Sequence, residues 1–133
     1  MRIFKFLLLS LVAVAFFACE PTYVKEYSWS YPLSGDWKVK AYVDGGEVGG
    51  PYEIKIYNSS FGQDSIWIDD YATTSSNGHF WSMKFKAAAD MSTKTFQTTG
   101  SVNAVKNYGI VISVANGKVI GTDSITMDVV FED

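Results

Sequence analysis

The sequence predicts an all-β protein: a small antiparallel meander β-barrel of about eight strands, with a β-sandwich as the alternative. From Cys19 onward the chain holds one leucine, Leu33, against 11 valines, eight isoleucines and nine threonines. Such β-branched side chains suit pleated strands and argue against a helix bundle. From Gly35 onward apolar and polar residues alternate with a period of two, and turn residues interrupt this pattern at short intervals. The 133 residues are enough for one such domain.

The first 18 residues have the features of a secretory signal peptide. Arg2 and Lys5 precede a short apolar run, which ends at Ala18 directly before Cys19. A basic start, an apolar stretch too short to span a bilayer and a small residue before the cleavage point predict a signal peptide over residues 1–18. An ordinary cleavage site that leaves a free thiol is the alternative.

The Ala18-Cys19 junction resembles a bacterial lipobox, in which the cysteine is acylated and becomes the first residue of the mature protein. Cys19 is the only cysteine of the chain. The resemblance implies lipidation at Cys19 and an N-terminal acyl anchor in a membrane. It places the protein in the cell envelope as a lipoprotein, at the outer membrane.

Residues 19–33 are predicted to be a lipidated tether before the barrel domain at 34–133. Two of the three prolines lie here, and no periodicity is sustained. Aromatic residues recur at every second position from Tyr27, so the later part of this segment could instead lie along the domain as an edge segment.

The alternation predicts the first strands in order. The first covers 35–43 and is expected to end at the glycine-rich segment 44–51. The second covers 52–58. The third, 65–69, is apolar at consecutive positions, which indicates that both of its faces are covered. A polar segment then leads to a strand over 81–86.

The second half of the chain is predicted to continue the meander. Residues 87–91 could form one helical turn. Residues 95–99 and 101–105 are expected to be two weaker strands on either side of Gly100. Asn116-Gly117 follows the strand at 108–114 and predicts a hairpin, because both residues tolerate positive φ. The last strand covers 124–131.

A barrel of this size has room inside for side chains or for one small ligand. Apolar residues that share the inward parity of their strands are therefore the candidate ligand-binding residues. These are Trp37, Tyr52, Ile54, Ile56, Trp81, Met83, Phe85, Met127 and Phe131. The same rings could equally be the core of a leucine-poor β protein, so a ligand requires that the interior be hollow.

Charge narrows the classes of partner. Residues 19–133 carry nine lysines, no arginine and 14 acidic residues, a formal net charge of −5. An acidic chain of this kind lacks the basic surface that nucleic acids require. It also lacks the guanidinium fork of many phosphate sites. No nucleic acid partner and no cofactor are predicted.

Catalytic and metal-binding residues are not assigned. His79, the only histidine, could serve with Asp69 or Asp70 in a Ser-His-Asp site, but no Gly-x-Ser-x-Gly pattern is present. A solvated His79 at the start of a strand is the simpler interpretation. One histidine cannot complete a zinc site beside a lipidated cysteine. Asp64, Asp69 and Asp70 match no EF-hand spacing and are expected to be solvated turn residues.

Gly35-Asp36-Trp37 resembles the Gly-x-Trp element of lipocalins, in which the tryptophan plugs the closed end of the barrel. A longer resemblance covers nearly all of the mature chain and lies in Trp37-Lys38-Val39 and the segments 52–61, 64–70, 81–86 and 116–120. In this order behind a lipobox, they resemble the lipid-binding, putative-hydrolase lipoproteins of Bacteroidota, a lipocalin-like family. The resemblance implies a calycin-type barrel with a lipid or other small hydrophobic ligand.

The predicted function is that of a membrane-anchored lipoprotein whose barrel binds such a ligand without catalysis. Whether the protein is an enzyme stays open, because the family description includes a hydrolase for which the sequence offers no residues. The alternatives are an esterase-like hydrolase acting on a lipid, and a surface module that binds glycan or protein through exposed aromatics such as Trp67 and Tyr57.

Overall fold

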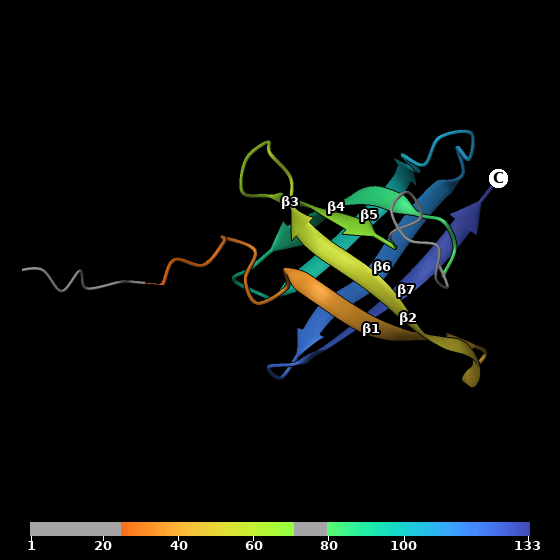
Figure 1. Ribbon diagram of the computed structural model, residues 1–133, viewed down its shortest axis with the longest axis horizontal. Coiled ribbons are helices and arrows are strands. Elements are labelled where there is room, and N and C mark those ends of the chain that lie inside the picture. Colours follow the sequence, from red (N-terminus) through yellow and green to blue (C-terminus); the bar gives the residue numbers. More distant parts are fainter. Residues whose placement is uncertain (1–24, 71–79) are drawn as a thin grey trace, which may run out of the picture.

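The chain folds as one antiparallel meander (Figure 1). The computed structural model describes residues 25–70 and 80–133. The strands are β1 (Gly35–Val43), β2 (Gly46–Asn58), β3 (Ser65–Asp69), β4 (Lys84–Asp90), β5 (Thr95–Val102), β6 (Val111–Ile120) and β7 (Ser124–Glu132). Each pairs with the next along the chain in a single seven-stranded sheet. The all-β antiparallel meander is thus confirmed, with seven strands where about eight are predicted.

The sheet curls into a half-barrel, consistent with a small lipocalin-like barrel. In Figure 1, β1 and β2 cross in front of β6 and β7. Within the described residues, β1 pairs only with β2, and β7 pairs only with β6. We call the inner-face side chains along these two edge strands the seam: Trp37, Val39 and Ala41 of β1, and Ile125, Met127, Val129 and Phe131 of β7.

The difference in strand number arises at Gly100. The two weak strands predicted around it are one strand, β5, which bends there with a register irregularity between Thr98 and Ser101. Gly100 has a φ of +67°, a conformation that glycine adopts without steric cost and that lets the strand continue. The helical turn predicted at 87–91 is also wrong, because β4 extends to Asp90.

The hairpin predicted at Asn116-Gly117 is wrong as well. β6 runs through both residues, with a register shift between Ala115 and Lys118, so the positive φ of Asn116 forms a bulge instead of a turn. A Cβ atom at Gly117 would lie 2.7 Å from the ring of Phe96. Glycine is therefore required here because another strand packs closely against it.

The glycine-rich segment 44–51 belongs mostly to a strand. The chain turns at Asp44-Gly45, and β2 begins at Gly46. β3 pairs only with residues 55–58 of β2, so Pro51 lies where β2 has a single neighbour. Pro51 also lies in the register irregularity between Tyr52 and Gly49, and a proline within a sheet is tolerated at such an irregularity.

The core lies on the inner face of the middle strands. Its fully buried side chains include Ile54 and Ile56 of β2, Ile66 and Ile68 of β3, Phe85 of β4, Phe96 of β5 and Ile112 of β6. By contrast, the seam side chains of β1 and β7 are only half-buried. The inner face is therefore fully covered on the middle strands and partly exposed on the two edge strands.

Residues ahead of β1 are packed on the domain. Leu33 is fully buried, and Trp29 packs against the core. Ser30 is buried and donates from Oγ to Asn58 Oδ1 at 3.2 Å. Of the two alternatives for the end of the predicted tether, packing along the domain is the one observed, as a turn and not as an edge strand. Residues 1–18 and Cys19 lie outside the described residues.

Candidate functional site

The half-barrel has two different ends. At the end where β1 begins, the Trp37 indole donates from Nε1 to the Leu33 carbonyl oxygen at 2.9 Å. Trp29, ahead of β1, and Met91, directly after β4, belong to segments at this end and pack against the core. We call this the closed end. The opposite end, where β3 and β7 finish and β4 begins, is called the mouth.

Four aromatic rings gather at the mouth. The ring centroids of Tyr52 and Phe80 lie 5.4 Å apart, and those of Phe80 and Phe131 lie 6.1 Å apart. The Trp81 indole stacks on Phe131. We call Tyr52, Phe80, Trp81 and Phe131 the mouth cluster. It bridges β2 and β7 through the segment that leads into β4, and Trp81 remains 46% exposed.

Asp70 holds this segment in place. Its carboxylate accepts the backbone N–H of Trp81 at Oδ2 and the backbone N–H of Met83 at Oδ1, each at 3.0 Å. The backbone N–H of Asp70 in turn donates to the Met83 carbonyl at 3.0 Å. Asp70 is buried, so the expectation of a solvated turn residue is wrong for it. Its side chain positions Trp81 at the mouth.

The buried side-chain amide of Asn103, which follows β5, also holds the segment that leads into β4. Asn103 accepts the Lys84 backbone N–H at Oδ1 at 2.8 Å. Its Nδ2 donates to the carbonyl oxygens of Ser82 and Tyr108, at 3.0 and 2.9 Å. Both hydrogen-bonding ends of the amide are therefore used, which fixes the chain around the mouth. Asn103 is not among the residues predicted from the sequence, since a single asparagine in a loop carries no distinguishing signal.

The nine candidate ligand-binding residues fall into three groups. Ile54, Ile56, Met83 and Phe85 are 0–1% exposed, so they have no surface to offer a ligand and form the filled side of the interior. Tyr52, Trp81 and Phe131 come together in the mouth cluster. Trp37 and Met127 are half-buried in the seam. A ligand-binding role for these residues stays a prediction.

The seam includes residues that sequence analysis did not select. Val39, Ile125 and Val129 are half-buried and, like Met127, pack against the core. Ile125 and Val129 share the parity of Met127 and Phe131, so the period-two pattern could have identified them. Phe80 could not be found in this way, because it precedes β4 and follows no strand parity.

The outer face of β2, β3 and β4 carries a separate group. Tyr57 donates from Oη to Asp69 Oδ2 at 3.2 Å. Burial, and to a smaller extent the Asp69 charge, raise the pKa of the Tyr57 phenol above 10.0, against the opposing effect of Lys84. The ammonium groups of Lys84 and Lys86 lie 5.3 and 5.0 Å from the Trp67 ring centroid. Trp67 thus faces outward, held between two lysines.

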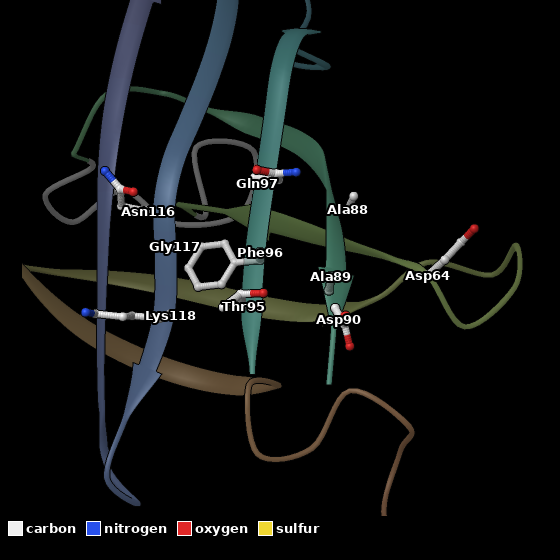
Figure 2. A pocket seen from close by; sticks show the side chains of 10 residues that line it. All are labelled: Asp64, Ala88, Ala89, Asp90, Thr95, Phe96, Gln97, Asn116, Gly117 and Lys118. Atoms are coloured by element: carbon white, nitrogen blue, oxygen red, sulfur yellow. The ribbon is translucent and has the colours of Figure 1, made fainter. Parts of the chain in front are cut away.

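A hollow of mixed polarity, with a volume of about 650 Å³, lies across β4, β5 and β6 (Figure 2). It is lined by Asp64, Ala88, Ala89, Asp90, Thr95, Phe96, Gln97, Asn116, Gly117 and Lys118. None of the nine candidate ligand-binding residues is among them. With carboxylates, amides and an ammonium group in its lining, it differs chemically from the apolar seam.

Metal and catalytic candidates can be placed only in part. His79 lies outside the described residues. Within 25–70 and 80–133, no three His, Cys, Asp or Glu side chains are grouped so that they could hold a metal ion. The same part of the chain contains no helix that is long and apolar enough to cross a membrane.

Comparison with known proteins identifies the family. No curated protein matches the chain. Residues 22–133, which include every strand of the half-barrel, match the family described as lipid-binding putative hydrolase. The match agrees with the resemblance in the sequence and with the lipocalin-like sheet. The chain therefore belongs to the lipid-binding putative hydrolase family.

Proposed function

We propose that this protein is a membrane-anchored lipoprotein whose half-barrel holds a lipid or other small hydrophobic molecule along the seam, without catalysis. One observation carries the proposal: the inner face is fully buried on the middle strands but only half-buried on β1 and β7. A ligand that covers these half-buried apolar side chains removes their remaining surface from water, and this burial favours binding.

The chemistry of the seam favours an apolar chain. On β7 the inward positions are Ile125, Met127, Val129 and Phe131, all apolar, whereas the outward positions between them include Asp128. Six residue steps along a strand give this row a length of about 20 Å. An extended acyl chain fits a row of this length, and each methylene group buried there contributes about 0.8 kcal/mol.

The mouth suits the polar end of such a ligand. Tyr52 and Trp81 are amphipathic rings, each with an apolar body and a hydrogen-bonding tip. Trp81 is partly exposed, and Phe131 links it to the apolar row of the seam. A lipid with its tail along the seam would therefore place its head group beside Trp81.

The non-catalytic part of the proposal is supported by the sequence, which contains no Gly-x-Ser-x-Gly pattern around a nucleophilic serine. Membrane attachment is supported by the position of Cys19 directly after a signal-like apolar run. Two or three acyl chains on one cysteine give stable anchoring.

Ligand binding is tested by extracting the purified protein with organic solvent, identifying co-purified lipids by mass spectrometry, and titrating the lipid-free protein with a fluorescent fatty acid. Val129→Trp fills the seam and is expected to weaken probe binding about tenfold or more. Val130→Trp is the matched control, since Val130 is the next residue on the same strand and points outward. Absence of both lipid and probe binding would refute the proposal.

Anchoring and catalysis need their own tests. Wild-type protein is expected in the membrane fraction, and its measured mass should include the acyl chains. The mass of Cys19→Ala protein should not include them. Ester substrates of fatty acids are expected to remain intact. Turnover that disappears in His79→Ala would contradict the non-catalytic part of the proposal and favour the hydrolase.

A further inference from the structure

Three aromatic side chains are exposed at the closed end. Tyr27, Tyr31 and Phe61 are 55%, 54% and 75% exposed. The rings of Tyr27 and Tyr31 lie against each other with centroids 4.3 Å apart, and Phe61 belongs to the turn between β2 and β3. The hydrogen bond from Ser30 to Asn58 ties the two segments together, and Figure 1 shows both at the same end of the half-barrel.

Lysines accompany these rings. Lys25 Nζ lies 5.0 Å from the Tyr27 ring centroid, and Lys86 Nζ lies 5.3 Å from that of Phe61. Exposed aromatic rings with ammonium groups at their sides are the combination that settles in the head-group region of a bilayer, where rings lie among the glycerol groups and lysines reach phosphates. Glu26 and Asp64 lie in the same two segments, so the aromatic rings and not a net positive charge must drive such binding.

The short stretch of chain between Cys19 and the closed end would keep this end near the membrane that holds the anchor. Lys25 is the first described residue, and the segment that it begins leads into β1 at the closed end. Cys19 precedes it by six residue steps, which span at most about 21 Å even when fully extended. An anchor at Cys19 would therefore hold the closed end within reach of the lipid head groups.

We infer that the closed end is a membrane-docking surface: Tyr27, Tyr31 and Phe61 enter the head-group region of the bilayer that holds the anchor, and the mouth faces away from it. The inference extends the membrane attachment in the proposed function and does not require a ligand in the seam. Its occupant is a lipid surface, because the anchor brings that surface to these residues.

The test measures binding to vesicles without the anchor. Among residues 25–70 and 80–133, every side chain of the core comes from Trp29 or later, so a chain that begins at Glu20 contains all of that core and lacks Cys19. We expect this chain to co-sediment with phosphatidylcholine vesicles. Added salt should have little effect, because these vesicles carry no net charge and Glu26 and Asp64 offset the two lysines beside the rings. Tyr31→Ser/Phe61→Ser should lower the partition coefficient about tenfold or more.

The matched control is Tyr42→Ser/Val48→Ser, at the opposite end. Tyr42 and Val48 are 60% and 62% exposed and flank the turn between β1 and β2. This variant should bind vesicles like the parent chain. No binding by the parent chain, or an equal loss in both variants, would overturn the inference. Fatty-acid titration of the same variants separates the two proposals, because neither substitution touches the seam.

Discussion

The indole of Trp81 stacks on the ring of Phe131, with centroids 4.8 Å apart and planes inclined by 15°. Trp81 lies just before β4, in the middle of the sheet, and Phe131 lies near the end of the edge strand β7. The stack therefore ties a free edge to the centre of the sheet, where no backbone ladder does so among the described strands. Phe80 extends this link to Tyr52 on β2.

The stack should contribute measurably to stability. In a double-mutant cycle of Trp81→Ala and Phe131→Ala, we expect a coupling free energy of about 0.5–1.5 kcal/mol. Urea unfolding of the four proteins gives this value. Strictly additive effects would mean that the two rings are neighbours without a stabilising interaction.

Asp70 is expected to be much more sensitive to substitution than an exposed aspartate. In Asp70→Asn one of the two backbone N–H groups faces an amide NH₂ and loses its acceptor. The expected loss of unfolding free energy is about 2–3 kcal/mol. Asp123→Asn, at an exposed turn, should stay within about 0.5 kcal/mol of wild type. Equal unfolding free energies for both variants would show that the buried carboxylate is not needed.

Gly117→Ala should destabilise the bulge of β6. The added methyl group would lie 2.3 Å from the Phe96 carbonyl oxygen and 2.7 Å from its ring, so strands β5 and β6 must separate. We expect a loss of about 1–3 kcal/mol in thermal or urea unfolding. Gly109→Ala is the control, because a Cβ there meets nothing within 4 Å. A neutral Gly117→Ala would indicate that β6 does not bulge at this position.

Stability above pH 10 should depend on Tyr57. Burial raises the pKa of its phenol above 10.0, so the folded protein binds this proton more tightly than the unfolded chain. The resulting stabilisation is complete below pH 10 and is lost as the pH rises through the pKa of the folded state. We therefore expect wild type to lose more unfolding free energy than Tyr57→Phe on passing above pH 10. Equal losses of unfolding free energy in wild type and Tyr57→Phe, measured by urea titration below and above pH 10, would contradict this.

Period-two alternation predicted much of the fold. It gave the faces of β1 and β7 correctly, because each strand has one inner and one outer face. It also selected Tyr52, Trp81 and Phe131, which meet at the mouth although they are far apart in sequence. Parity alone cannot tell which inward residues stay accessible, since that depends on where the sheet fails to close.

Local turn signals were less reliable for a physical reason. Positive φ at Asn116 serves a bulge as well as a hairpin, and only the packing of Phe96 on Gly117 decides between them. Asp70 gives the same lesson, because an aspartate after an apolar strand is usually solvated. Its burial depends on two N–H groups 11 and 13 residues further along the chain.

The unpaired edges of the sheet have a consequence for ligand selectivity. A closed barrel has a bore set by its strand number and stagger. Here no ladder hydrogen bond joins β7 to β1 among the described strands, so side-chain contacts such as those of Phe131 hold this edge. The width of the space for a ligand is then not set by a closed ladder of hydrogen bonds. We therefore expect branched or unsaturated hydrocarbons to bind as readily as straight ones, and chain length to be the stricter criterion.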